Sequence, residues 1–277
     1  MTRAATAALL GLVLAQPPGI PITPRSRSIR PGELVILSIA APSAAGAMHV
    51  RAFGHDVAAY RVDGEWRALV GIDLDVKPGT HPVTVQTGSA RTTYDLVVKP
   101  RAFRTRTLTV DPAFVTPPES ERERIERETK LLDEVWKSSS PERLWSEEFV
   151  RPVPQPANSA FGTRSVFNGQ PRNAHGGADF LSPAGTIILA PNAGRIAVAR
   201  SLYFSGNTVV IDHGLGLFST LAHLSAFDVH EGDRVTAGQR IGLVGATGRV
   251  TGPHLHWAVR ASGARIDPLS VLALLGR

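Results

Sequence analysis

The chain has 277 residues, of which 43% are hydrophobic and 19% charged, so it can bury the cores of two domains and does not resemble a disordered protein. Lys and Arg number 30 against 24 acidic residues, and the net charge of +6 favours anionic partners such as cell-wall polymers or membrane surfaces, while no lysine-rich tail or basic-aromatic array points to nucleic acid. The absence of cysteine excludes disulfides, thiolate metal sites, a cysteine nucleophile and a lipid-modified cysteine.

The N-terminus is typical of a secretory signal peptide. Arg3 precedes the small and apolar run AATAALLGLVLA, which ends at Ala15 before a polar, proline-rich stretch. About 12 apolar residues are too few to span the roughly 30 Å hydrocarbon layer as a helix. We therefore predict a signal peptide over residues 1–15, followed by export; the alternative is an uncleaved or cytosolic apolar N-terminus. No other segment has the apolar length to cross a membrane, so no stable membrane insertion is expected after cleavage.

Residues 30–110 are predicted to form a β-sandwich. Short β-type runs alternate with turn signals, such as the Asp-Gly pair at 63–64 and the Lys-Pro-Gly sequence at 77–79, at the spacing expected of a small sandwich. Three histidines of this region lack metal-ligand spacing and acidic neighbours, and we interpret them as surface or packing residues: His49, His55 and His81.

A connector helix is predicted over residues 116–140. Thr116 is placed to cap it, Pro117 suits the first helical position, and Glu119 completes a capping box. The apolar residues that fall on one face are Ile125, Leu132, Val135 and Trp136. Pairs of opposite charge four residues apart are Glu123 with Arg127 and Glu126 with Lys130. The charge-balanced run ERERIERE indicates a solvated face, so we expect the helix to pack against a domain and to space the two halves.

A domain boundary is predicted in the proline-rich stretch at residues 150–160, which has the composition of a stiff linker. From residue 161 to 277 β-type runs return, punctuated by many glycines that mark tight turns and close backbone approaches. The final stretch DPLSVLALLGR is expected to close the core as a short apolar helix or strand. We expect residues 161–277 to fold independently.

Six of the nine histidines lie between residues 175 and 256, and two of them belong to the stretch GPHLHW. If this stretch is extended, His254 and His256 leave the same face of a strand, with Cα atoms about 6 to 7 Å apart. One imidazole can then bind a metal while the other reaches water on that metal. The spacing alone is equally compatible with two ordinary polar residues on a wet sheet face.

The stretch NAHGGADF adds His175 and, four positions later, Asp179, while LAHL adds His223. The two intervening glycines argue against a helix, so we expect His175 and Asp179 to converge from a loop that enters a strand. Two imidazoles and one carboxylate suit Zn²⁺, and three protein ligands leave the open position for water that hydrolysis needs. Further histidines beside the ion could take a proton from that water, stabilise the oxyanion or protonate the leaving amine.

These motifs resemble the M23 family of zinc metallopeptidases, also called the lysostaphin or LytM-type family. The similarity runs from about Phe161 to Pro268 through HGGAD, SPAGTIILAPNAGRI, GNTVVIDHG, LFSTLAHLS and EGDRVTAGQRIGLVGATGRVTGPHLHW. The order of HxxxD, a histidine after the central hairpin and HxH is highly specific. The segment FGTRSVFNGQPRNAH and the β-rich region before it also resemble bacterial members that carry an N-terminal immunoglobulin-like domain.

The resemblance implies a role for each motif residue. His175, Asp179 and His256 become the zinc ligands, and His254 and His223 become the catalytic pair, with His254 as general base and His223 at the oxyanion, or the reverse. None of the five positions is substituted here. The implied fold is mostly β, with an N-terminal immunoglobulin-like β-sandwich, a helical connector and a C-terminal antiparallel β-sheet peptidase domain.

The implied activity is a zinc-dependent endopeptidase that cleaves peptide bonds in peptidoglycan stem peptides or cross-bridges, at a periplasmic or cell-envelope location. One alternative is a wall-binding regulator that retains the metal and activates another wall hydrolase. Another is a metal-dependent hydrolase of a different substrate, which would need a pocket rather than an open groove. The sequence predicts no nucleic-acid partner and leaves the oligomeric state open.

Several polar residues near these motifs receive structural interpretations. His213 lies at a predicted hairpin turn, where backbone hydrogen bonding is expected, and Asp212 beside it is interpreted as structural. His230 is interpreted as a surface turn residue. Tyr203 and Asn207 flank a hairpin that could border the groove, and the sequence assigns them no role.

Overall fold

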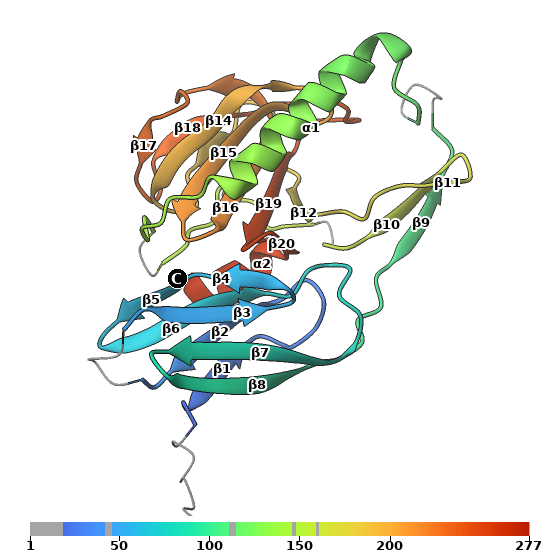
Figure 1. Ribbon diagram of the computed structural model, residues 1–277. Helices are drawn as coiled ribbons and strands as arrows, with labels where there is room; N and C mark the ends of the chain where they lie inside the picture. Colours follow the sequence, from blue (N-terminus) through green and yellow to red (C-terminus); the bar gives the residue numbers. More distant parts are fainter. Residues whose placement is uncertain (1–18, 42–45, 111–114, 146–147, 159–160, 277) are drawn as a thin grey trace, which may run out of the picture.

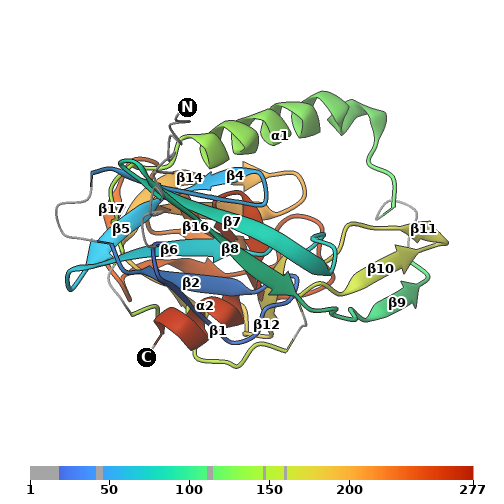
Figure 2. The same cartoon turned by 60° about the horizontal axis from the view of Figure 1, so that its bottom comes forward.

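The computed structural model describes residues 19–41, 46–110, 115–145, 148–158 and 161–276. The predicted signal peptide lies outside these described residues. Strands dominate the structure, and Figure 1 shows them in two bodies. Figures 1 and 2 both show one long helix, α1, along the outside of the strands. The mostly β fold class is therefore confirmed. Among the described residues, no helix combines the length and the apolar character needed to cross a membrane.

Two four-stranded antiparallel sheets form the N-terminal sandwich (Figure 1). The first sheet, in spatial order, contains β1 (Ile22–Ser26), β2 (Leu34–Ile39), β6 (Glu65–Gly71) and β5 (Ala59–Val62). The second contains β4 (His55–Val57), β3 (Met48–Ala52), β7 (Gly79–Thr87) and β8 (Ala90–Val98). Both sheets contribute to one apolar core, as a sandwich requires. Its immunoglobulin-like character stays a prediction.

Strand β2 is buried on both faces. Val35, Leu37 and Ile39 belong to the sandwich core. Leu34 and Ile36, which alternate with them and so point to the opposite side, belong to the core of the C-terminal domain. The first sheet is therefore a layer shared by two cores, which explains why the run LVILSI is apolar at every position but Ser38 instead of alternating.

Charged side chains also join the sandwich to the C-terminal domain. Arg27 Nη2 donates to Glu33 Oε1 at 2.7 Å and to Asp267 Oδ2 at 2.8 Å. Arg265 Nη2 donates to Asp73 Oδ1 at 2.7 Å. The carboxylates of Glu33 and Asp267 are almost fully buried, and buried charges are tolerated only when they are paired. These contacts hold the two bodies in one relative orientation.

The connector helix starts later than predicted. A 3-10 turn, η2 (Glu119–Glu121), precedes helix α1 (Arg122–Lys137), and no side chain caps either element. The capping roles predicted for Thr116 and Glu119 are therefore wrong. Pro118 explains the shift, because a proline disfavours helical geometry in the residue before it, and its own ψ of 147° keeps the chain extended.

Helix α1 packs on the C-terminal sheet through its predicted apolar face. Val135 is buried there, with Leu132 and Trp136 packed beside it. The expected pair of Glu123 and Arg127 is present, with 3.5 Å between Oε2 and Nη1. The helix therefore lies along one domain, with its charged face outward, rather than only spacing two halves.

A small three-stranded sheet projects from the body (Figure 1). It contains β9 (Thr105–Leu108), β10 (Arg164–Phe167) and β11 (Gln170–Pro171). Strands β9 and β10 run parallel, so the segment after the sandwich pairs with the segment that leads into the HGGAD motif.

Nine strands form the large C-terminal sheet. Its main path, in spatial order, contains β12 (Gly177–Phe180), β19 (Leu255–Ala261), β16 (Leu217–Phe227), β15 (Gly206–Gly214), β14 (Gly194–Leu202) and β17 (Arg234–Val235). The others are β13 (Ile187–Leu189), β18 (Arg240–Val244) and β20 (Ala264–Ile266). Helix α2 (Pro268–Leu275) follows, so the C-terminal stretch is a helix, capped by Asp267 through Leu269 N.

The proline-rich segment is not a free linker. Phe149 and Val153 are buried in the C-terminal core, and so is Trp145 before them. The apolar side chains between the prolines explain the difference, because they complete this core from outside the large sheet. A fragment that starts at residue 161 lacks all three side chains and the shared first sheet, so its independent folding is no longer expected.

We predict that Phe149→Ala lowers the free energy of unfolding by about 3–5 kcal/mol, the range for truncating a buried aromatic side chain. Phe149 is 1% exposed, and its ring lies 5.2 Å from that of His213. Chemical denaturation measures the change. The control is Leu181→Ala, because Leu181 is 63% exposed and should cost less than about 0.5 kcal/mol. If both substitutions changed the free energy of unfolding by the same small amount, residues 148–158 would be peripheral to the core.

Candidate metal centre and catalytic site

Two of the predicted ligands face each other across neighbouring strands. Strands β12 and β19 are antiparallel, and their register places Asp179 opposite His256. Residues directly opposite on one face have Cβ atoms about 4.5–5.5 Å apart, close enough for their side chains to touch. The contact is observed, with 2.8 Å between Asp179 Oδ1 and His256 Nδ1.

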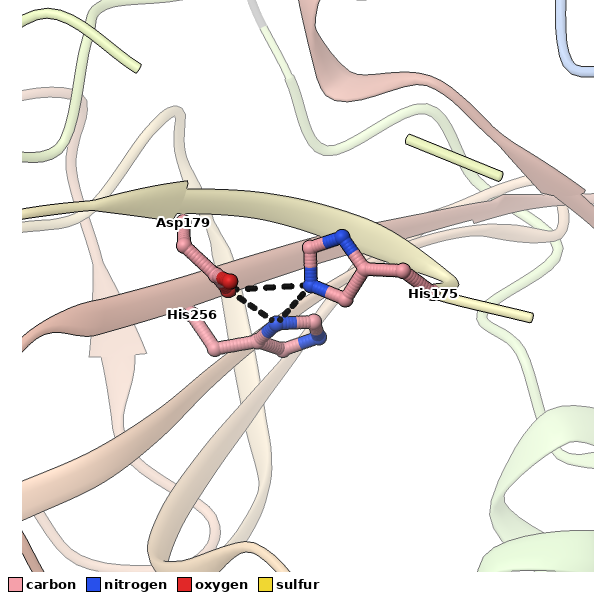
Figure 3. Close-up of side chains that lie close together, drawn as sticks. All are labelled: His175, Asp179 and His256. Atoms are coloured by element: carbon pink, nitrogen blue, oxygen red, sulfur yellow. Dashed lines mark hydrogen bonds and ion pairs between the residues drawn. The ribbon is translucent and has the colours of Figure 1, made fainter. Parts of the chain in front are cut away.

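His175 joins this pair from the loop before β12, as expected. Its backbone is held at both ends: His175 N donates to Thr163 O at 2.9 Å, and Gly162 N donates to His175 O at 2.8 Å. The ring then points at the other two side chains, with Nε2 3.0 Å from Asp179 Oδ1 and 3.1 Å from His256 Nδ1 (Figure 3).

The convergence of these three atoms suits a metal ion. Hydrogen bonds alone account for only two of the three contacts, because each of the two imidazole nitrogens carries at most one proton and the carboxylate carries none when ionised. Ligand atoms on a tetrahedral Zn²⁺ with bonds of 2.0–2.1 Å lie about 3.3 Å apart, so the observed triangle of 2.8–3.1 Å needs to widen by only a few tenths of an ångström. The donor set of two nitrogens and one oxygen is one that zinc prefers.

The electrostatics favour the protonation states that ligands need. Burial would raise the pKa of the Asp179 carboxyl, but its contacts with the His175 and His256 rings outweigh burial and hold this pKa well below its usual range. Burial lowers the pKa of His256, although its contact with Asp179 opposes this. The carboxylate is therefore ionised and the His256 ring neutral at pH 7, as metal ligation requires.

Gly177 makes room for the His256 ring. A Cβ atom at residue 177 would lie 2.4 Å from Trp257 O and 2.8 Å from His256 Cε1, whereas at Gly176 it would meet no atom within 4 Å. We predict that Gly177→Ala displaces His256, lowers zinc content and costs about 1–3 kcal/mol of stability. Gly176→Ala is the matched control and should keep zinc; zinc analysis and thermal unfolding compare the two. Full zinc occupancy in both variants would contradict this role of Gly177.

His254 lies beside the ligand cluster, at an isolated bridge with Gly245 just before β19. Its Nδ1 is 2.9 Å from Gly252 O, and its Nε2 is 4.0 Å from Asp179 Oδ1. A carbonyl oxygen can only accept, so Nδ1 carries the proton, and Nε2 of the neutral ring is an acceptor that faces the cluster. The two histidines of HxH thus lie at one site, as expected if the backbone of this motif is extended.

His223 reaches the same site from β16 through an unusual backbone conformation. Its φ of 69° lies in the left-handed region, and its N–H donates to Ser205 O at 2.9 Å. Its Nδ1 donates to Thr247 O at 3.0 Å, and its ring centroid lies 4.8 Å from that of His254. Burial lowers the pKa of His223 to about 4, although the bond to Thr247 O opposes the shift.

The structure thus brings together all five residues singled out in the sequence. It also shows a residue that sequence reasoning missed, Thr247, which accepts from His223 through its carbonyl oxygen and binds Leu224 O and Asn207 N through its hydroxyl group. The polar position inside the glycine-rich run GATG is the signal that could have found it.

The remaining polar residues have structural contacts. His213 is fully buried, with Nδ1 2.7 Å from Ala193 O and Nε2 2.9 Å from Ser219 Oγ, and burial lowers its pKa to about 4. Asp212 accepts from Ser140 N at 2.7 Å. His230 is exposed in a turn. None of these three belongs to the candidate metal group found among the described residues.

Comparison with known proteins identifies a family and several relatives. A sequence profile described as "Peptidase family M23" matches residues 173–268. The chain is 42% identical over 95 residues to peptidoglycan DD-endopeptidase ShyA of Vibrio cholerae. These matched residues cover 34% of this chain and 22% of the relative. It is 44% identical over 97 residues to DD-carboxypeptidase/endopeptidase Mpg of Neisseria meningitidis, and these residues cover 35% of this chain and 22% of that relative. The matches thus span about a fifth of these relatives' length.

One solved structure matches most of the chain. A Pseudomonas aeruginosa protein assigned to peptidase M23 is 32% identical, and the superposition covers 89% of this chain and 96% of that protein with a TM-score of 0.73. The similarity therefore includes the sandwich and the connector as well as the large sheet. On the strength of this match and of the family profile over the HxxxD and HxH motifs, the chain belongs to peptidase family M23.

Proposed function

We propose that this protein is a zinc-dependent endopeptidase that hydrolyses peptide bonds in the stem peptides or cross-bridges of peptidoglycan. The observation that carries the proposal is the convergence of His175, Asp179 and His256 within hydrogen-bond distance, with His254 and His223 beside them. A hydrolytic metal site needs three ligands, an open position and a nearby base, and three candidate ligands with two histidines beside them fit this requirement.

When bound, zinc would supply a Lewis acid that polarises the scissile carbonyl and lowers the pKa of water. His254 is our candidate general base, because its Nε2 is an acceptor that faces the ligands at 4.0 Å from Asp179 Oδ1. The proton taken from the attacking water can then pass from Nε2 to the leaving amine, which restores the neutral ring. His223 can stabilise the oxyanion only when its Nε2 is protonated; in its neutral tautomer it is a second base, so the two roles can be exchanged.

Two lines of support point to peptidoglycan as the substrate. Two relatives that are 42% and 44% identical to this chain over the catalytic region are named peptidoglycan DD-endopeptidase and DD-carboxypeptidase/endopeptidase. The chain also carries arginines near the site residues in sequence: Arg249 is two residues beyond Thr247, and Arg172 is three before His175. Burial and then the Arg172 charge lower the pKa of Arg249. Guanidinium groups suit the carboxylates of an acidic peptide.

The cellular location follows from the same proposal. Peptidoglycan lies outside the cytoplasm, so we propose that residues 1–15 direct export and that the protein acts in the periplasm or cell envelope. We further propose that the catalytic unit includes residues 139–158 in addition to the predicted 161–277, because Trp145, Phe149 and Val153 are buried in its core.

Mass spectrometry of muropeptides tests the function. Purified full-length protein is incubated with intact sacculi, with and without a chelator, and the products are compared. Zinc-dependent release of peptides with new amino termini is expected, and the masses identify the bond. Binding to sacculi without new termini would contradict the endopeptidase and support the metal-retaining regulator.

A further inference from the structure

Helix α1 lies along the C-terminal sheet (Figure 1). One half of the helix is anchored by aromatic packing. The Trp136 and Phe218 rings meet edge to face at 5.3 Å, and the Arg260 guanidinium lies 5.0 Å from the centroid of the Trp136 ring. The C-terminal half of the helix is therefore fixed on the sheet. The N-terminal half extends toward the turn between β14 and β15, where it makes a different kind of contact.

Glu128 makes this contact. Its Oε2 accepts a hydrogen bond from Tyr203 N at 2.7 Å, while its Oε1 accepts from Arg124 Nε at 2.8 Å. The Glu128 side chain is only 17% exposed, against 89% for Glu123 and 73% for Glu134 on the same helix. A carboxylate held by two donors in a partly buried setting is a strong acceptor, so Glu128 differs from the solvated charges around it.

The turn that Glu128 binds is also the turn that holds His223. Two residues after Tyr203, Ser205 O accepts from His223 N at 2.9 Å. Asn207 N donates a hydrogen bond to Thr247 Oγ1 at 2.9 Å, and Thr247 O in turn accepts one from His223 Nδ1 at 3.0 Å. The turn therefore contacts the backbone of His223, and the start of β15, directly after the turn, contacts the residue that orients the His223 ring.

His223 needs such support because of its backbone. A φ of 69° is disfavoured for any residue with a side chain, so the conformation persists only where neighbouring bonds enforce it. The bonds that do so come from the turn and from Thr247. The His223 and His254 ring centroids are 4.8 Å apart. A shift of the turn would relax the His223 backbone and move the two rings apart.

We propose that Glu128 is a positioning residue that fixes the β14–β15 turn and thereby holds His223 in place. The connector helix is then part of the support of the catalytic site and not only a spacer. The catalytic consequence rests on the proposed function, whereas the structural link between Glu128 and the turn does not.

The test compares three full-length variants. Glu128→Ala removes both acceptors, Glu128→Gln keeps a carbonyl oxygen for Tyr203 N, and Glu123→Ala removes an exposed ion pair of the same helix with Arg127. Amide hydrogen exchange of the segment 202–207 and zinc content are measured for each variant. Turnover and KM are then determined on peptidoglycan fragments.

We expect Glu128→Ala to exchange faster over 202–207 and to lose about tenfold in kcat, as small misplacements of catalytic groups do, with KM and zinc content unchanged. Glu128→Gln should restore most of the protection and the turnover, and Glu123→Ala should match the wild type. Unchanged exchange in Glu128→Ala overturns the proposal, whether or not the wild type cleaves peptidoglycan. A Gln variant as impaired as the Ala variant also overturns it, because the hydrogen bond would then not be the cause. An inactive wild type with the expected exchange pattern would refute the proposed function alone.

Discussion

Replacing His256 or Asp179 with alanine is expected to remove zinc from the protein and to abolish hydrolysis. Each of these side chains supplies one of the three proposed ligand atoms. Either substitution therefore leaves only two protein ligands for the metal. Loss of an outer partner of a ligand already costs about 10–100-fold in metal affinity, so loss of a ligand should cost more than a hundredfold. Zinc per chain, measured by elemental analysis, and peptide release should fall together.

The controls are alanine variants of exposed residues of the same types. His230 and Asp56 have side chains that are 93% and 86% exposed, so His230→Ala and Asp56→Ala should keep about one zinc per chain and full activity. In the wild type, a chelator should remove both zinc and activity, and added zinc should restore both. Full activity in a metal-free His256→Ala protein would refute the zinc mechanism.

The sequence predicts the site better than it predicts the path of the chain around it. The HxH spacing allows His254 and His256 to share one site, because alternate residues of an extended segment share a face, but it fits two ordinary polar residues equally well. The pairing of β12 with β19 is less accessible, since it joins segments about 77 residues apart and depends on how the whole sheet assembles. The choice of His256 as ligand came from the family resemblance, and the contact with Asp179 Oδ1 at 2.8 Å agrees with it.

Two features of the N-terminal half show why composition misleads about domain boundaries. The run LVILSI looks like an ordinary sandwich strand, but its lack of alternation reflects burial on both faces, against two cores. The proline-rich segment has the composition of a linker, yet Val153 in it and Phe149 directly before it are buried. In both cases the partner surface is distant in sequence, so local patterns indicate burial without saying against what.

Backbone conformation at His223 was the least predictable feature. The run LAHL marks a positive φ only weakly, because histidine adopts that region more often than most residues with a side chain but far less readily than glycine. The conformation results from hydrogen bonds with Ser205 and Thr247, in segments that come together only when the sheet forms. A sequence pattern can therefore nominate His223, but the reason it points at His254 lies in tertiary structure.

His254→Ala is expected to keep zinc and to lose at least about a hundredfold in turnover, because it removes the proposed general base while leaving the three ligand atoms in place. His223→Ala should also retain zinc, since its ring is 6.1 Å from that of His256 and contributes no atom to the ligand triangle. This separation of metal binding from turnover distinguishes the two histidines from the ligands. Zinc content and kcat on the same preparations measure it, with His230→Ala as the matched control. A zinc-replete His254→Ala protein with near-normal turnover would exclude His254 as the base and leave that role to His223, whose neutral ring also presents Nε2 as an acceptor.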